Sequence, residues 1–174
     1  GPTYIKCVAY SNGGHGDIDP CKALMKSCND VMMHMAADLG ATRFAKYVRS
    51  FGFGSKTGID LPGEAEGGIF SKEKLHQVEL ATSSFGQGQT VTMIQLASAF
   101  SAVINGGNYY QPHVVKEINS ESGAVVSSND NTLVKRVVSE DASKLIRKYL
   151  EKTVEDDEGT ANPARVKGYV IGGK

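Results

Sequence analysis

The stretch ELATSSFGQGQTVTMIQLASAFSAVINGG, residues 79–107, contains the clearest helix signal in the chain. Thr92 is a preferred N-cap residue, and apolar side chains recur at helical spacing after it. These are Leu96, Phe100, Val103 and Ile104. Gly106 and Gly107 then follow, as is common where a helix ends. Residues 79–107 therefore predict a glycine-containing break followed by one long helix.

Five further segments predict helices. Asp19 is an N-cap candidate with Pro20 at the first helical position, ahead of CKALMK. Asp30 begins the periodic run VMMHMAADL, which Gly40 ends. The remaining expected caps are Thr42 before RFAKYVRSF, Ser71 before KEKLHQVELA and Ser139 before EDASKLIRKYLEKTVE. The last of these helices has one expected apolar face, made of Leu145, Ile146, Tyr149 and Leu150.

Strand signals gather in the last third of the chain. Residues 109–119 and 123–128 flank the turn SESG and predict a hairpin. Residues 133–138, LVKRVV, predict another strand, and residues 165–173, RVKGYVIGG, alternate as a strand does. The expected fold class is therefore α+β, helix-rich with a few antiparallel strands.

Composition excludes several classes of protein. The chain has 174 residues, 40% of them hydrophobic and 22% charged, and a net charge of zero, which is ordinary for one globular domain. No basic stripe marks a nucleic-acid surface. No apolar run reaches the length of a membrane span.

The cysteines and histidines do not follow a metal-binding pattern. Cys7, Cys21 and Cys28 form no C-x-x-C pair, and the four histidines are scattered. A zinc site built from these cysteines and His15 would lack the usual ligand spacing. We therefore expect small buried or partly exposed thiols, no metal and no cofactor.

Three short motifs of serine acyl-transfer enzymes can be found in the chain. S-x-x-K occurs at residues 71–74, S-x-N at residues 27–29 and K-T-G at residues 56–58. The first is a charged, water-exposed helix start, where a capping serine is the better interpretation. The K-T-G lies in a glycine-rich turn, although a catalytic one belongs on a strand. A second S-x-N, residues 127–129, lies in a polar turn.

The end of the chain matches a different motif. Residues 168–174, GYVIGGK, have the spacing G-x-x-x-x-G-K of a phosphate-binding loop. Such a loop opens a helix whose N-terminus meets the nucleotide, and here apolar residues fill the loop instead. A nucleotide site is therefore not expected.

Several stretches, taken in order, resemble the transpeptidase domain of class B penicillin-binding proteins, especially the division and sporulation types of Gram-positive bacteria. They are IKCVAYSNGGHG, ALMKSCND, FGFGSKTGIDLPGE, residues 79–107, QPHVVKEI and GYVIGGK. The resemblance implies a helix-rich fragment of the penicillin-binding protein transpeptidase and serine β-lactamase-like fold. Residues 1–174 would be a partial transpeptidase domain, without the upstream S-x-x-K segment and without the strands after Lys174.

The resemblance also assigns site residues. Its S-x-N corresponds to Ser27, Cys28 and Asn29, and its catalytic K-T-G begins at Lys174, while residues 56–58 belong to a distant loop. Ser27 would relay a proton, and Asn29 would hydrogen-bond the substrate amide. Lys174 would attract the substrate carboxylate. Gly172 and Gly173 would let the substrate backbone approach closely. The nucleophilic serine would lie upstream of Thr3.

By resemblance, the parent protein crosslinks peptidoglycan stem peptides ending in D-Ala-D-Ala and is acylated by β-lactams. It would act outside the cytoplasmic membrane, held by a segment absent here, alongside cell-wall synthesis and division proteins. We expect this chain alone to be inactive, with an exposed strand edge that favours dimerisation. The alternative is a non-catalytic module of the cell-wall machinery.

Overall fold

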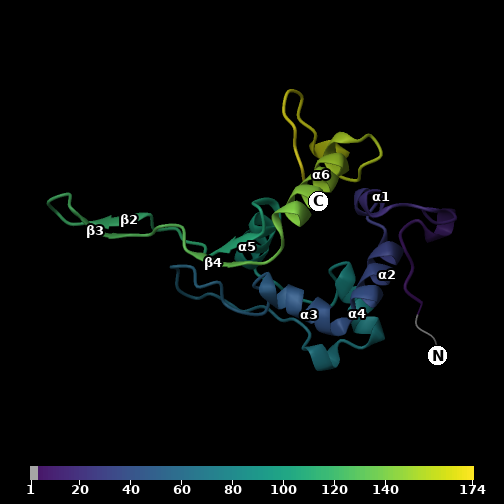
Figure 1. The fold of residues 1–174 in the computed structure, drawn as a ribbon, viewed down its shortest axis with the longest axis horizontal. Helices are drawn as coiled ribbons and strands as arrows, with labels where there is room; N and C mark the ends of the chain where they lie inside the picture. Colours follow the sequence, from purple (N-terminus) through teal and green to yellow (C-terminus); the bar gives the residue numbers. More distant parts are fainter. Residues whose placement is uncertain (1–3) are drawn as a thin grey trace. The chain divides into compact units, whose positions relative to one another are not determined.

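The computed structural model describes residues 4–174, which form two compact units (Figure 1). The first unit contains the described residues up to Ala45, together with Phe70–Gln89 and Lys144–Lys174. The second contains Lys46–Ile69 and Thr90–Ser143. None of the helices in residues 4–174 combines the length and the apolar composition needed to cross a membrane.

Helices predominate, and the strands are short. The helices are α1 (Pro20–Met25), α2 (Asn29–Leu39), α3 (Ala41–Ser50), α4 (Gln77–Ser84), α5 (Met93–Ile104) and α6 (Glu140–Glu155), with 3-10 turns at Tyr10–Asn12, Lys72–Lys74 and Asn162–Ala164. The strands are β1 (Asn108–Tyr110), β2 (Glu117–Asn119), β3 (Val125–Ser128) and β4 (Leu133–Arg136). The predicted helix-rich α+β class is confirmed.

Side-chain capping explains three of the six α-helix starts, those of α1, α5 and α6. The Asp19 carboxylate accepts the backbone N–H of Lys22 at 2.7 Å, so α1 begins at Pro20 as predicted. The hydroxyl of Ser139 likewise accepts the N–H of Ala142 at 3.2 Å at the start of α6. Gly40 ends α2, which is also as predicted.

Two predicted caps were wrong. Helix α3 begins at Ala41, directly after Gly40, so Thr42 lies inside the helix. Ser71 makes no capping hydrogen bond and precedes only the Lys72–Lys74 turn. Leu75 explains this interruption, because it is buried with a non-helical ψ of 68°, and α4 starts only after it.

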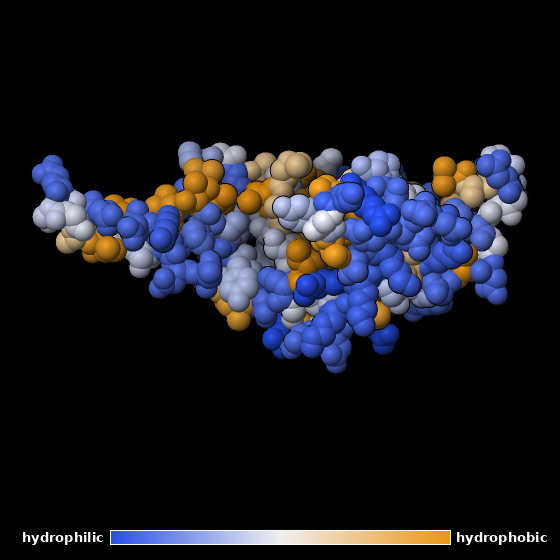
Figure 2. Space-filling view, turned by 90° about the horizontal axis from the view of Figure 1, so that it is seen from above, coloured by the Kyte–Doolittle hydropathy of each residue, from blue (hydrophilic) through white to orange (hydrophobic). Residues whose placement is uncertain are grey.

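The strands form two antiparallel pairs. β2 pairs with β3, which confirms the predicted hairpin and its turn at Ser120–Gly123. β1 pairs with β4, so residues 109–119 are not one continuous hairpin arm. Apolar side chains of the hairpin reach its surface, including Ile118, Val125 and Val126, and the hairpin is the arm at the left of Figures 1 and 2.

The predicted strand at residues 165–173 is wrong. These residues form turns and irregular backbone, and no strand pairs with them in the part of the chain that the structure describes. Two of their N–H groups bond to α6 instead: Ile171 to the Glu155 carboxylate and Gly173 to the Leu150 carbonyl. Residues 171–173 therefore follow α6, although the alternating sequence of residues 165–173 favours a strand.

The core of the first unit surrounds the start of α2. Its buried cluster consists of Cys7, Ala23 and Cys28, with Ile18, Val31 and Met32 packed against it. Helix α2 also packs against α4. The small residues of the cluster let the chain before α1 approach the joint between α1 and α2 closely.

Gln95 organises the second unit. Its side-chain oxygen accepts the N–H of Thr92 at 2.9 Å, and the Thr92 hydroxyl accepts the N–H of Gln95 at 3.2 Å, so the two residues form a capping box. The same side chain donates to the carbonyls of Ser55 at 2.7 Å and Glu66 at 2.8 Å. A fully buried amide thus ties the glycine-rich loop to α5.

The buried face of α5 differs from the predicted one. Leu96 and Ile104 are 47% and 37% exposed. The buried residues are small or polar, and they are Gln95, Ser98, Ala99 and Ala102. Small side chains allow β1 to pack directly on the helix, where Tyr109 is only 5% exposed. The close approach of β1 to α5 therefore takes the place of the predicted apolar face of α5.

The predicted Gly106–Gly107 helix end is confirmed, and Ser143 completes it. The Ser143 hydroxyl donates to the Val103 carbonyl at 2.6 Å and accepts the N–H of Gly106 at 3.0 Å. Gly107 has a φ of +90°, and a Cβ there would lie 2.0 Å from the Val138 carbonyl oxygen. Glycine is therefore required at position 107.

We expect Gln95→Ala to destabilise the chain by about 1–3 kcal/mol, because it leaves buried hydrogen-bonding groups without partners. Urea unfolding measures the change. Gln87→Ala is the control, since Gln87 is exposed, and a shift within about 0.5 kcal/mol is expected for it. Equal effects of the two substitutions would contradict the role given to Gln95.

Candidate functional site

Ser27 lies at a tight joint between α1 and α2. The N–H of Cys28 donates to the Ala23 carbonyl at 2.9 Å, and the N–H of Ser27 donates to the Leu24 carbonyl at 3.2 Å. This pair of bonds is the Schellman ending of a helix, in which the residue at the Ser27 position is left-handed. The joint therefore satisfies the last carbonyls of α1 and starts α2 within two residues.

The backbone of Ser27 is strained. Its φ of 54° is the only positive φ of a non-glycine residue within residues 4–174. A side chain in this conformation costs about 1–2 kcal/mol, which is why glycine usually occupies it. The left-handed turn leaves the Ser27 side chain exposed, while Cys28 is buried and Asn29 is half-buried at the first position of α2.

The structure brings Lys174 to Ser27. The Lys174 ammonium donates a hydrogen bond to the Ser27 hydroxyl, although the two residues are 147 positions apart. Partial burial lowers the pKa of Lys174 below its ordinary value. A lowered pKa makes the neutral amine of Lys174 more accessible than that of an ordinary lysine.

Thr160 is a third member of this group. Its hydroxyl oxygen lies 3.5 Å from the Ser27 oxygen and 3.5 Å from the Lys174 nitrogen. Its backbone N–H donates to the Met25 carbonyl at 3.1 Å, at the end of α1. The sequence analysis missed Thr160, because nothing in its neighbourhood along the chain marks it.

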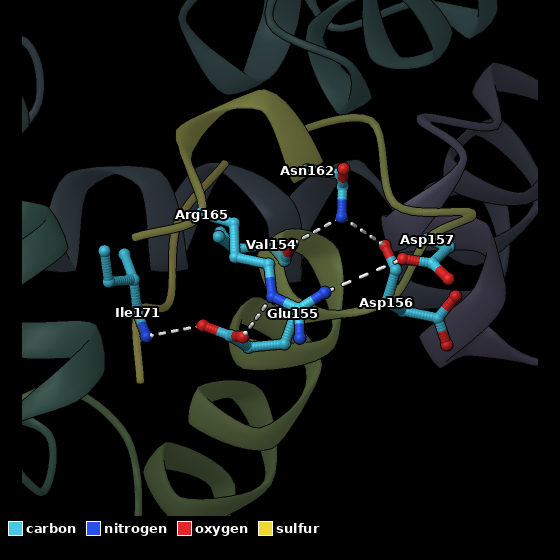
Figure 3. Close-up of polar contacts among 7 residues, drawn as sticks. All are labelled: Val154, Glu155, Asp156, Asp157, Asn162, Arg165 and Ile171. Carbon is cyan, nitrogen blue, oxygen red and sulfur yellow. Dashed lines mark hydrogen bonds and ion pairs between the residues drawn. The ribbon is translucent and has the colours of Figure 1, made fainter. Parts of the chain in front are cut away.

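An ion-paired loop holds Thr160 against α1. Glu158 pairs with Lys22 at 3.2 Å and with Lys26 at 3.5 Å, and the hydrogen bond from Lys22 is the main reason that the pKa of Glu158 is lowered. Asn162 donates to the Val154 and Asp156 carbonyls, both at 3.3 Å (Figure 3). These contacts fix the loop between α6 and the terminal segment.

Helix α6 positions the terminal segment that carries Lys174. Glu155 accepts the Ile171 N–H at 3.0 Å with one carboxylate oxygen and pairs with Arg165 at 3.1 Å with the other, as Figure 3 shows. A Cβ at Gly172 would lie 3.3 Å from the Glu151 nitrogen. Gly172 thus allows the segment to approach α6 closely, which is a structural use of this residue.

The K-T-G of residues 56–58 has a structural role. Thr57 donates its N–H and its hydroxyl to the Glu64 carboxylate, and the N–H of Gly58 donates to the same group at 3.0 Å. These bonds, chiefly the Thr57 hydroxyl, lower the pKa of Glu64. The tripeptide closes a loop of the second unit, whereas Ser27 and Lys174 belong to the first.

The first unit also gathers three possible metal ligands. The Cys7 sulfur lies 3.5 Å from His15 Nδ1 and 4.0 Å from the Cys28 sulfur. Burial raises the pKa of Cys28, whereas at Cys7 backbone hydrogen bonds outweigh the effect of burial and lower the pKa. Cys21, whose pKa burial raises, is outside the group. The spacing of Cys7, His15 and Cys28 along the sequence does not predict that their side chains meet.

Comparisons with known proteins identify the family of the chain. Residues 2–174 match the family model described as penicillin binding protein transpeptidase domain. Stage V sporulation protein D of Bacillus subtilis is 43% identical over 171 residues, which cover 98% of this chain and 26% of that protein. The chain thus spans about a quarter of this curated relative.

Solved structures share the fold. The D,D-transpeptidase domain of a peptidoglycan glycosyltransferase from Eggerthella lenta has a TM-score of 0.85 at 25% identity, covering 95% of this chain and 43% of that one. Penicillin binding protein 3 of Mycobacterium tuberculosis, complexed with ampicillin, has a TM-score of 0.81 at 27% identity. That match covers 86% of this chain and 34% of the other.

The strain at Ser27 leads to a paired prediction. Ser27→Gly and Ser27→Ala both lose the hydroxyl, but only glycine relieves the left-handed backbone. We expect Ser27→Gly to be more stable than Ser27→Ala by about 1 kcal/mol in urea unfolding. Equal stability of the two variants would mean that the backbone here is not strained.

Proposed function

Because the chain belongs to the transpeptidase family of penicillin-binding proteins, we propose that Ser27, Asn29 and Lys174 form part of the active site of a peptidoglycan D,D-transpeptidase. The observation that carries the proposal is the hydrogen bond from the Lys174 ammonium to the Ser27 hydroxyl. It joins the two motifs that the family resemblance assigns to the site, from opposite ends of the chain.

Each residue has a role suited to its chemistry. A serine nucleophile attacks the carbonyl of the penultimate D-alanine, the peptide C–N bond breaks, and the released D-alanine amine takes up a proton. The Ser27 hydroxyl, which can both accept and donate, would relay that proton, and the lowered pKa of Lys174 supports such a transfer. The Asn29 amide would hydrogen-bond the substrate peptide.

The nucleophile itself would come from an S-x-x-K segment upstream of Thr3. Losing a serine nucleophile costs roughly a million-fold in rate in a comparable serine enzyme. We therefore expect residues 1–174 alone to have no transpeptidase activity.

The substrates would be peptidoglycan stem peptides, and β-lactams would acylate the same nucleophile. Solved complexes of the Mycobacterium tuberculosis relative with aztreonam and ampicillin support this ligand class. The name of the Bacillus subtilis relative supports a role in sporulation. Peptidoglycan lies outside the cytoplasmic membrane, so we place the parent protein there, with cell-wall synthesis and division proteins as partners.

Intact mass after incubation with ampicillin tests the proposal, on this chain and on one extended at both ends by its native sequence. An adduct is expected on the extended chain alone. In the extended chain, Ser27→Ala should slow acylation by about 10²–10⁴-fold, the usual contribution of a proton-transfer group.

Ser71→Ala is the matched control, because residues 71–74 spell S-x-x-K at an exposed turn. Its acylation rate in the extended chain should equal that of the unchanged sequence. An adduct on the short chain would place a nucleophile within residues 1–174 and contradict the proposal. An extended chain that takes up no β-lactam would favour a non-catalytic module instead.

A further inference from the structure

Three metal-binding side chains meet beside the joint between α1 and α2. The sulfurs of Cys7 and Cys28 and a ring nitrogen of His15 all lie within 4.8 Å of one another. Both cysteines are 4% exposed, while His15 is half-buried. None of the three belongs to the Ser27 and Lys174 hydrogen-bonded group.

Two of the three separations between these ligand atoms are close to those in a zinc tetrahedron, and the third is at most 4.8 Å. With the usual Zn–S and Zn–N bond lengths, two sulfur ligands lie about 3.8 Å apart, and a sulfur and a nitrogen ligand about 3.5 Å apart. The observed separations are 4.0 Å between the Cys7 and Cys28 sulfurs and 3.5 Å between the Cys7 sulfur and His15 Nδ1. An ion therefore needs only small side-chain movements to bind all three.

We propose that Cys7, His15 and Cys28 bind a zinc ion, with water as the fourth ligand. Thiolate sulfur and imidazole nitrogen are the ligands that Zn²⁺ prefers, and a set of two cysteines and one histidine with an open position occurs in known zinc proteins. The half-buried His15 leaves the ion a route from solvent. The proposal concerns metal binding and does not depend on the proposed transpeptidase function.

Backbone structure around the cluster suits a charged sulfur. The backbone N–H groups of Ala9, Asn29 and Asp30, the last two at the start of α2, lower the pKa of the Cys7 thiol. Donors at a helix N-terminus stabilise an anion, and zinc binds cysteine as the thiolate. The backbone around Cys7 is therefore compatible with a thiolate ligand.

A glycine-rich loop carries His15 back to the cysteines. Gly13, Gly14 and Gly16 have φ values of 87°, 84° and 69°. The N–H of Gly14 bonds to the Ala9 carbonyl at 2.9 Å, so the chain folds back directly after Cys7. These left-handed residues bring the imidazole within reach of sulfurs 8 and 13 positions away along the sequence.

The experiment uses the 174-residue chain, purified under a thiol-free reductant and dialysed after exposure to ZnCl₂. Elemental analysis should give about one zinc per chain. CoCl₂ in place of ZnCl₂ should give intense visible bands and near-ultraviolet thiolate-to-metal absorption, as tetrahedral cobalt thiolates do. Competition with a chromophoric chelator measures the zinc affinity.

Cys7→Ser, Cys28→Ser and His15→Ala should each lower zinc affinity by more than about 100-fold, since even outer-shell partners contribute 10–100-fold. Cys21→Ser is the matched control, because Cys21 is a buried thiol outside the cluster, and its variant should keep full affinity. Circular dichroism of each metal-free variant checks that its helices persist. His15→Ala changes only a loop residue, so its result remains informative if a cysteine variant unfolds.

Three outcomes would overturn the proposal. One is a reduced, folded chain that takes up no zinc. Another is zinc uptake that survives the double change Cys7→Ser and Cys28→Ser, or that is lost in Cys21→Ser. The third is a Cys7–Cys28 disulfide that persists in reductant, because it would leave no thiolates to bind a metal. Intact mass detects it, since the disulfide form of the chain is two hydrogens lighter than the reduced form.

Discussion

The left-handed turn at Ser27 is the constraint on which the first unit depends. Two backbone hydrogen bonds end α1 there, and the chain turns directly into α2. Because the turn takes only two residues, adjacent side chains point into different environments. Ser27 is exposed toward Lys174, and Cys28 is buried against Cys7 and Ala23. The left-handed turn at Ser27 thus places the Ser27 hydroxyl beside Lys174 and the Cys28 sulfur beside Cys7.

Helix α6 supplies the second half of the site by binding irregular backbone. Its Glu155 carboxylate and Leu150 carbonyl accept N–H groups of the terminal segment. In the second unit, Gln95 acts in a similar way toward the glycine-rich loop. In both units, helices hold long irregular segments through a few specific polar contacts, because such backbone has no ladder to satisfy its own hydrogen bonds.

Sequence reasoning succeeded where a feature is decided within a few residues. The Asp19 and Thr92 caps and the Gly106–Gly107 helix end depend on neighbours along the chain. It failed where distant contacts decide. Burial of Leu75 delays α4, and α6 takes the hydrogen bonds that a strand at residues 165–173 would have used.

The candidate site shows the same division. Family resemblance placed Ser27 and Lys174 together, but Thr160 follows only from the folding of its loop onto α1. Similarly, the spacing of Cys7, His15 and Cys28 argued against a metal site, because metal motifs read from sequence assume ligands on one short loop or helix. Here the three side chains of the proposed site come from two parts of a folded-back loop and from the residue before α2.

The choice of serine at position 27 lowers the stability of the turn but supplies a hydroxyl group to the site. A glycine would adopt the left-handed backbone at less cost, since a side chain there destabilises by about 1–2 kcal/mol. Serine gains a hydroxyl that accepts a hydrogen bond from Lys174 and lies 3.5 Å from the Thr160 hydroxyl. The Ser27 side chain is exposed. Strain of this kind persists when the surrounding structure imposes it, and at functional sites it serves the mechanism. The strained serine is therefore best explained by the use of its hydroxyl group.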